Sequence, residues 1–120
     1  MLRKFAPIVA LLLLAGCATV PAPKSYTERV ASAYSGVAIT FDTIAILANA
    51  GTISKDQGRE AVRQTKQVRE AVDVAATFKG PLGEDKLQTA QDLLRAAQDF
   101  LCKDKPTEPN CAYLIQRARP

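Results

Sequence analysis

Cysteines are the side chains in this sequence best suited to covalent chemistry, and the spacing of two of them points to a cross-link. Cys102 and Cys111 enclose a polar, proline-containing stretch, CKDKPTEPNC. In a chain exported to an oxidising compartment this pattern indicates a disulfide, and closing a ring of about ten residues stabilises a small domain by about 2.5–3 kcal/mol. A metal site is the alternative interpretation. It would require more ligands than two thiols, and the chain contains no histidine.

Acid–base catalysis has few candidate groups. Without histidine, the usual proton acceptor near neutral pH, the conceivable carboxylate pairs are Glu84 with Asp85 and Asp42 with Glu70. Glu84 and Asp85 are explained more simply as acidic residues favoured at a helix N-terminus. The stretch Gly80 to Gly83 indicates a turn between helices and not a phosphate-binding loop. We therefore expect no enzymatic activity, no metal and no cofactor.

The N-terminal segment, residues 1–16, has the three parts of an export signal. Arg3 and Lys4 form a basic start, an apolar stretch follows, and Ala15 and Gly16 are small. The apolar stretch is about ten residues long, about half of what a membrane-spanning helix needs. The segment therefore predicts a cleaved signal and not a transmembrane anchor.

The end of this segment, Leu14-Ala15-Gly16-Cys17, resembles the lipobox of bacterial lipoproteins. The resemblance implies cleavage after Gly16 and a covalent lipid on Cys17, which becomes the first residue of the mature chain. The absence of Asp after the cysteine, where this chain has Ala18, implies an outer-membrane destination facing the periplasm. The alternative, a free cysteine buried in a core helix, leaves the basic start and the leucine run unexplained.

Domain boundaries and charge follow from this interpretation. Residues 17–25 would be the lipidated cysteine and a proline-containing tether reaching about 25 Å, and residues 26–120 a periplasmic helical domain. Removing residues 1–16 takes away two of the sixteen basic residues and none of the twelve acidic ones, so the formal charge falls from +4 to +2. A charge this small, with few aromatic residues, argues against nucleic acid as a partner.

Helical periodicity dominates the remaining sequence. We expect helices from about Ser25 to Ala50, from Ser54 to Lys79 and from about Asp85 to Cys102, with Gly51 after the first helix. Ser54 and Gln57 have the spacing of a capping box. Short connections favour antiparallel neighbours. The prediction is an all-α fold: a small three-helix bundle, formed by an antiparallel helical hairpin plus a third helix, with a C-terminal tail pinned by the disulfide. In this tail Tyr113, Leu114 and Ile115 are expected to cover an end of the bundle.

The first expected helix has apolar residues on two sides. Its predicted core face contains Val30, Val37, Ile44, Tyr34, Phe41 and Ala48, and its predicted polar lines contain Glu28, Ser35, Asp42 and Asn49, and Arg29, Gly36 and Thr43. Ile39 and Ile46 lie between these polar lines. In one interpretation the helix is covered on both sides by the other helices or by the tail. In the other, the two isoleucines form a contact surface for a second copy or another envelope protein.

These features favour a non-catalytic interaction or structural module, anchored to the outer membrane through its lipid. In size and composition the chain is also similar to small helical lipoproteins of phages and prophages, which implies superinfection exclusion or a role in lysis. A lipid-anchored inhibitor or small-ligand-binding protein is the alternative from another class. Alanine-rich helix faces, which favour close helix approach, argue against an internal cavity for such a ligand: Ala71, Ala75, Ala76, Ala90, Ala96 and Ala97.

Overall fold

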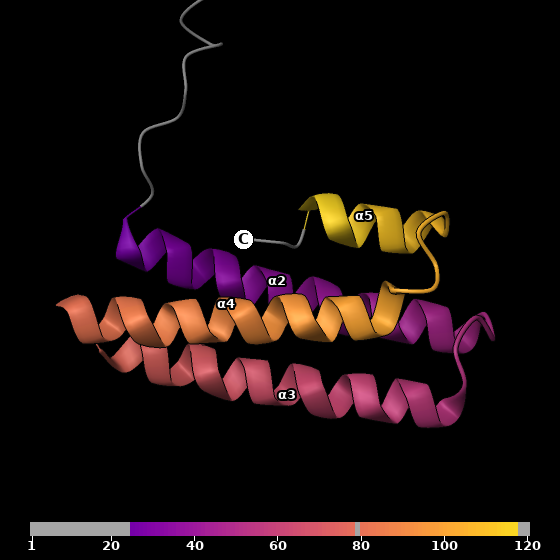
Figure 1. The fold of residues 1–120 in the computed structure, drawn as a ribbon, viewed down its shortest axis with the longest axis horizontal. Helices are drawn as coiled ribbons and strands as arrows, with labels where there is room; N and C mark the ends of the chain where they lie inside the picture. Colours follow the sequence, from indigo (N-terminus) through magenta and orange to yellow (C-terminus); the bar gives the residue numbers. More distant parts are fainter. Residues whose placement is uncertain (1–24, 79, 118–120) are drawn as a thin grey trace, which may run out of the picture.

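The computed structural model describes residues 25–78 and 80–117, and within them the chain is all-α, as predicted. Four helices follow one another: α2 (Tyr26–Asn49), α3 (Lys55–Thr77), α4 (Gly80–Cys102) and α5 (Pro109–Arg117). The first three run antiparallel to their sequence neighbours as a bundle, and the short α5 lies along α2 and the end of α4 (Figure 1). The predicted signal, the lipobox Leu14 to Gly16 and the lipid site at Cys17 lie outside the described residues.

Local capping determines where the first two helices begin. The Ser25 side chain accepts a hydrogen bond from the Glu28 amide at 3.2 Å, and the Ser54 side chain accepts one from the Gln57 amide at 3.1 Å. These bonds satisfy backbone donors that the first turn of a helix leaves open. Gly51, which follows α2, has a φ of +74°, the left-handed conformation expected after a helix end. The predicted start and end signals of the first helix are therefore confirmed.

The connection between α3 and α4 differs from the prediction. Helix α3 ends at Thr77 instead of Lys79, and α4 begins at Gly80, five residues before the expected start at Asp85. Pro81 lies in the first turn of α4, where its missing N–H and fixed φ cost nothing, so it begins the helix instead of marking a turn. Glu84 and Asp85 consequently lie in the second turn of α4 and not at its N-terminus.

Two apolar clusters form the core along the bundle. The first is built by α2, α3 and α4, and its buried residues are Val30, Ala33, Val37, Val68, Val72, Ala75, Leu87, Ala90, Leu94 and Ala97. The second includes α5 and the α2–α3 loop, and its buried residues are Ile44, Leu47, Ile53, Ala61, Leu101, Cys102, Cys111 and Leu114. The alanines among these residues let the helix axes approach closely.

A buried polar layer separates the two clusters along the helices. Thr40, Thr65 and Gln98 have no exposed surface. The two threonine hydroxyls donate to the carbonyl four residues earlier in their own helices at 2.7 Å, and the Gln98 amide donates to the Thr40 hydroxyl at 3.4 Å. Sliding α4 by one turn would separate the Gln98 amide from the Thr40 hydroxyl and place the amide among apolar side chains, so this layer favours one register.

The buried face of α2 is wider than the sequence pattern indicated. Gly36 and Thr43, predicted on a polar line, are buried, whereas Ala48, predicted in the core, is exposed. Three helices, α3, α4 and α5, pack on α2, so a wide face of this helix is covered. Thr43 tolerates burial because its hydroxyl donates to the Ile39 carbonyl at 2.8 Å.

The disulfide between Cys102 and Cys111 is present, as predicted, and it holds α5 against the bundle. Its Cα atoms are 5.6 Å apart and both cysteines are buried. The Glu108 carboxylate accepts hydrogen bonds from the amides of Asn110 and Cys111 at 2.8 and 3.1 Å, which caps α5. Of the three tail residues expected to cover the bundle, only Leu114 does so. Tyr113 and Ile115 are 54% and 39% exposed.

Reducing the disulfide is expected to lower the free energy of unfolding by about 2.5–3 kcal/mol, because the unfolded chain regains the entropy of an open loop. Urea unfolding with and without a thiol reductant measures the difference. A Cys102→Ala/Cys111→Ala variant is the control: it should be destabilised without reductant and insensitive to it. Coincident curves for the oxidised and reduced protein would contradict the prediction.

Candidate interaction surface

The solvent-facing side of α2 is poor in charge. We define the outer α2 face by its exposed residues Glu28, Ala31, Ser35, Ala38, Asp42, Ala45, Ile46 and Asn49, of which only Glu28 and Asp42 are charged. The exposed residues of α3, in contrast, include Lys55, Asp56, Arg59, Arg63, Lys66, Arg69, Glu70 and Asp73. Helix faces that remain in water normally resemble that of α3. The outer α2 face is therefore a candidate contact surface.

Helix α2 is also long and apolar enough to cross a membrane when judged by length and composition alone. The same property is found in core helices of soluble bundles, and 44% of the apolar window of α2 is buried within this bundle. Helix α2 therefore has two kinds of apolar residue. Some are buried in the core, and the others are exposed on the outer α2 face.

A groove of about 470 Å³ lies beside this face, between α2 and α3. We call it the α2–α3 groove, and its lining residues are Phe41, Ile44, Ala45, Ala48, Lys55, Gly58, Arg59 and Val62. Most of this lining is apolar, and Lys55 and Arg59 are its two charged residues. The only ion pair of Arg59 within the described chain is a loose one, 3.8 Å from Asp56 with both side chains largely exposed. Such a pair contributes little, so the groove combines an apolar lining with available positive charge.

Small side chains create the groove. Ala45 and Ala48 line it from α2, and Gly58 lines it from the first turns of α3. A Cβ atom on Gly58 would lie 3.7 Å from Ile53 Cδ1 and 4.0 Å from the Ala48 methyl, which are ordinary contacts. Packing within the chain therefore does not require glycine here, although glycine inside a helix is unfavourable.

A polar contact joins α2 and α3 about two turns before the groove. The Tyr34 hydroxyl donates a hydrogen bond to the Asp73 carboxylate. This hydrogen bond raises the pKa of the Tyr34 hydroxyl above its ordinary value, because it stabilises the protonated phenol. The contact joins the two helices on the side of the groove that is nearer the α2 N-terminus.

The two isoleucines singled out by the sequence occupy different environments. Ile39 is half-buried and packs against the second core cluster, to which α5 contributes Cys111 and Leu114. Ile46, two turns further on, is 48% exposed. Helix α5 and the core therefore account for much of Ile39, whereas Ile46 belongs to the outer α2 face.

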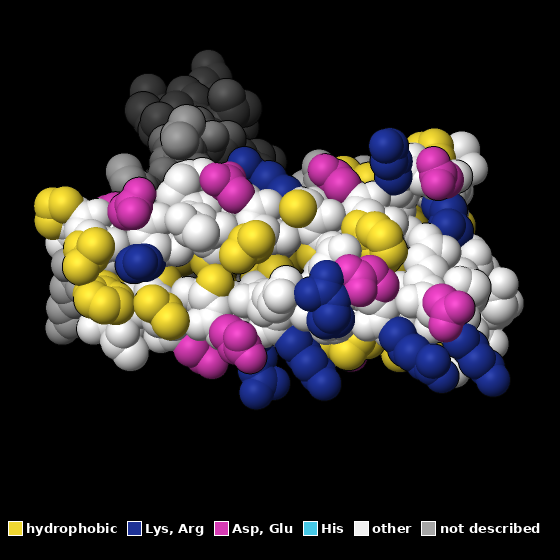
Figure 2. Space-filling view, turned by 60° about the horizontal axis from the view of Figure 1, so that its bottom comes forward, with side chains coloured by type: hydrophobic (Ala, Val, Ile, Leu, Met, Phe, Trp, Pro, Cys, Tyr) yellow, Lys and Arg dark blue, Asp and Glu magenta, His cyan; other side chains and the backbone are white. Residues whose placement is uncertain are grey.

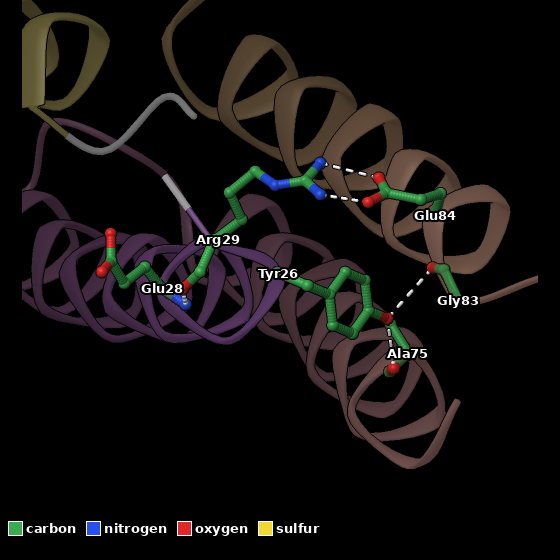
Figure 3. A network of polar contacts seen from close by, with 7 residues as sticks. Tyr26, Glu28, Arg29, Ala75, Gly83 and Glu84 are labelled. Atoms are coloured by element: carbon green, nitrogen blue, oxygen red, sulfur yellow. Dashed lines mark hydrogen bonds and ion pairs between the residues drawn. The ribbon is translucent and has the colours of Figure 1, made fainter. Parts of the chain in front are cut away.

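The opposite end of α2 is held by polar contacts with both other long helices (Figure 3). The Tyr26 hydroxyl lies within hydrogen-bond distance of two carbonyl oxygens, that of Ala75 in α3 and that of Gly83 in α4, the latter at 3.0 Å. A Cβ on Gly83 would lie 3.0 Å from both the Tyr26 hydroxyl and the Phe78 carbonyl, so this close approach favours glycine.

Arg29 adds a paired contact at the same end. Both of its terminal nitrogens hydrogen-bond to the Glu84 carboxylate, one of them at 2.7 Å. The hydrogen bonds from Arg29 hold the pKa of Glu84 below its ordinary value. Glu84, which the sequence offered with Asp85 as a conceivable acid–base pair, is thus bound to a guanidinium group that joins α2 to α4. Asp42, from the other conceivable pair, lies exposed on the outer α2 face, and Glu70 is exposed on α3.

Across residues 25–78 and 80–117 there is no group of three or more His, Cys, Asp or Glu residues placed to hold a metal ion. Comparison of the chain with protein-family models, with curated proteins and with solved structures gives no match. The outer α2 face and the α2–α3 groove must therefore be interpreted from their own geometry.

Sequence reasoning missed the α2–α3 groove. Gly58 inside an expected helix and the heptad spacing of Ala31, Ala38 and Ala45 were the available signals. Neither signal shows by itself which helix faces enclose a groove, because that depends on how α3 packs beside α2.

Gly58→Ala is expected to raise the free energy of unfolding by about 0.5–1 kcal/mol, because alanine favours the helix and its methyl group meets no clash. Urea unfolding followed by circular dichroism measures the change. Gly83→Ala is the matched control, since its methyl group would lie too close to the Tyr26 hydroxyl and the Phe78 carbonyl and should destabilise the fold. A destabilised Gly58→Ala variant would show that the groove is packed more tightly than described.

Proposed function

We propose that this protein is a lipoprotein anchored in the outer membrane through Cys17, facing the periplasm, and that it acts without catalysis by binding an envelope partner through the outer α2 face and the α2–α3 groove. The observation that carries the proposal is the exposed, almost uncharged outer α2 face beside an apolar groove. Apolar surface of this kind on a soluble domain usually marks an interface.

The proposed anchor and the groove lie at opposite ends of the bundle, which supports separate roles for them. The tether would join the bundle at Ser25, before the first residue of α2, and the last turns of α2 lie at the opposite end of the bundle (Figure 1). Ile46 and the groove lie near those last turns. At 1.5 Å per residue, Ile46 is about 32 Å along the helix from Ser25. A partner bound there would be held well away from the anchor.

The charge at the groove indicates the chemistry of the partner. Lys55 and Arg59 border an apolar lining, and Lys55 also lies at the N-terminus of α3, where the helix dipole favours negative charge. An amphipathic helix with apolar side chains and neighbouring Asp or Glu residues would complement both features. We therefore favour an acidic helical segment of another envelope protein over a second copy of this chain.

A second candidate function is the binding of a small apolar molecule in the same groove. Its volume of about 470 Å³ falls in the range of ligand sites, and this observation favours the idea. The groove lies at the surface between two helices, however, and an extended partner would fill it better than a small ligand would. A phage-encoded origin is a narrower form of the main proposal, and the genes beside this one would test it.

The anchor is tested by Cys17→Ser. Without the thiol no thioether-linked lipid can form, so the variant should lose lipid modification and remain an unprocessed precursor. Mass spectrometry of the purified protein and separation of outer from inner membranes measure both effects. Cys102→Ala/Cys111→Ala is the matched control and should retain the lipid. A Cys17→Ser variant that is processed and localised like the native chain would refute the lipid anchor.

The interaction surface is tested by photocrosslinking in living cells, with the photoreactive residue at Ile46. A discrete adduct with another envelope protein is expected, and mass spectrometry would identify it. Leu93, an aliphatic residue of α4 that is 40% exposed, is the matched control and should give no such adduct. Equal labelling at both positions, or links only within the chain, would reject the outer α2 face as the working surface. An adduct with a second copy would correct the choice of partner.

A further inference from the structure

We infer that the end of the bundle nearest Ser25 rests on the surface of the membrane, with an apolar end patch seated among zwitterionic lipids. We define the apolar end patch by Val74, Phe78, Pro81 and Leu82. The inference rests on the proposed function, because the lipid on Cys17 would hold this end of the molecule near the bilayer. It adds a second contact with the membrane, made by the folded domain itself.

The apolar end patch is formed where α3 ends and α4 begins. Leu82 and Val74 are 51% and 45% exposed, Pro81 is exposed, and Phe78 is half-buried. Figure 2 shows hydrophobic side chains gathered at this end of the molecule. Leu82 lies in the first turn of α4 and is not part of the core. The first leucine of this helix in the core is Leu87. Nothing in the described bundle covers this apolar surface, which water solvates poorly.

The attachment of α2 brings the start of the chain to the same end. The Tyr26 hydroxyl contacts the carbonyl oxygens of Ala75 and Gly83, which flank the α3–α4 connection on both sides (Figure 3). Ser25 therefore lies beside the helix ends that carry the apolar end patch. The eight residues that follow Cys17, up to and including Ser25, would reach about 25 Å as a proline-containing extended segment.

Because the tether is short, weak contacts between the apolar end patch and lipid are sufficient to orient the domain. Joining a domain to a surface through a short linker gives an effective concentration on the order of millimolar, so a patch with only millimolar affinity for lipid would still be seated much of the time. Four apolar residues are too few for stable membrane binding alone, but they are enough to orient a domain that is already anchored. Seating this end would direct the long axis of the bundle away from the membrane and hold the α2–α3 groove outward.

The charges around the apolar end patch fit a zwitterionic surface. Arg29 and Glu84 are paired with each other, and Asp85 and Lys86 follow with opposite charges. In the sequence, Asp73 precedes Val74 and Lys79 follows Phe78, and these two residues also carry opposite charges. A strongly anionic surface would attract a cluster of basic residues, and the described residues of this end contain no such cluster. Phosphatidylethanolamine carries both an ammonium and a phosphate group, and it is therefore the lipid that we expect to contact the apolar end patch.

The test uses tryptophan as a depth probe, because the chain contains none. The lipidated Leu82→Trp chain is reconstituted into vesicles of phosphatidylethanolamine and phosphatidylcholine, with either ordinary or brominated acyl chains. Bromine quenches tryptophan only when the two are close. We expect a shift of the Leu82→Trp emission to shorter wavelength and a loss of intensity in the brominated vesicles. Adding Val74→Asp, which places a charge in the apolar end patch, should reverse both effects.

Leu93→Trp is the matched control, since Leu93 is 40% exposed on the same helix and about 16 Å further from the α4 N-terminus. It should show neither shift nor loss, and an equal response from both probes would overturn the orientation. Mass spectrometry of the same samples shows whether Cys17 carries lipid, so the anchor and the seating of the apolar end patch are tested separately. A chain with lipid on Cys17 whose Leu82→Trp emission is unaffected by bromine refutes the seating and leaves the anchor intact. A chain without lipid on Cys17 refutes both.

Discussion

Helix α2 carries more apolar surface than one neighbouring helix can cover, and the arrangement of the other helices follows from this. Its buried residues span Val30 to Leu47 and face α3, α4 and α5. Burial of apolar surface is the main favourable term in folding, at about 25 cal/mol per Å². The α3–α4 hairpin covers one side of α2, and α5 covers another. A surface as apolar as that of α2 could not remain in water along its whole length without this cover.

The packing of α5 on α2 depends on the disulfide between Cys102 and Cys111. Nine residues are too few to form a stable helix alone, and α5 contributes mainly Cys111 and Leu114 to the core. The disulfide to Cys102 holds this short helix in place. The polar layer of Thr40, Thr65 and Gln98 favours one register, because the hydrogen bond from the Gln98 amide to the Thr40 hydroxyl forms only when α2 and α4 are correctly aligned. Apolar burial thus drives association, while the disulfide and the polar layer select one arrangement.

The two ends of the bundle differ in chemistry, and the proposed function assigns a role to each. At one end Tyr26 and Arg29 bind α2 to α3 and α4, and the apolar end patch lies beside them. At the other end the small residues that line α2 and α3 leave the groove beside Ile46, with Lys55 and Arg59 at its border. A lipid anchor near the first end and a partner at the second would make the bundle a spacer. Its rigidity would set the distance between them.

The sequence by itself determined the properties that depend on local chemistry. Helical periodicity, the caps at Ser25 and Ser54 and the spacing of Cys102 and Cys111 act within a few residues, so the all-α fold and the disulfide could be predicted from them. The signal and the lipobox are equally local, and they remain predictions because they lie outside the described residues.

Only the tertiary structure decided which helix faces are covered. Gly36 and Thr43 are buried because α3, α4 and α5 all pack on α2, and no local pattern indicates where helices far along the chain will pack. For the same reason the sequence placed Ile39 and Ile46 together, whereas the fold half-buries one against the second cluster and exposes the other. The α2–α3 groove likewise depends on contacts between distant segments. Exposure is a property of the packed helices together, and the candidate surface could be located only once that packing was known.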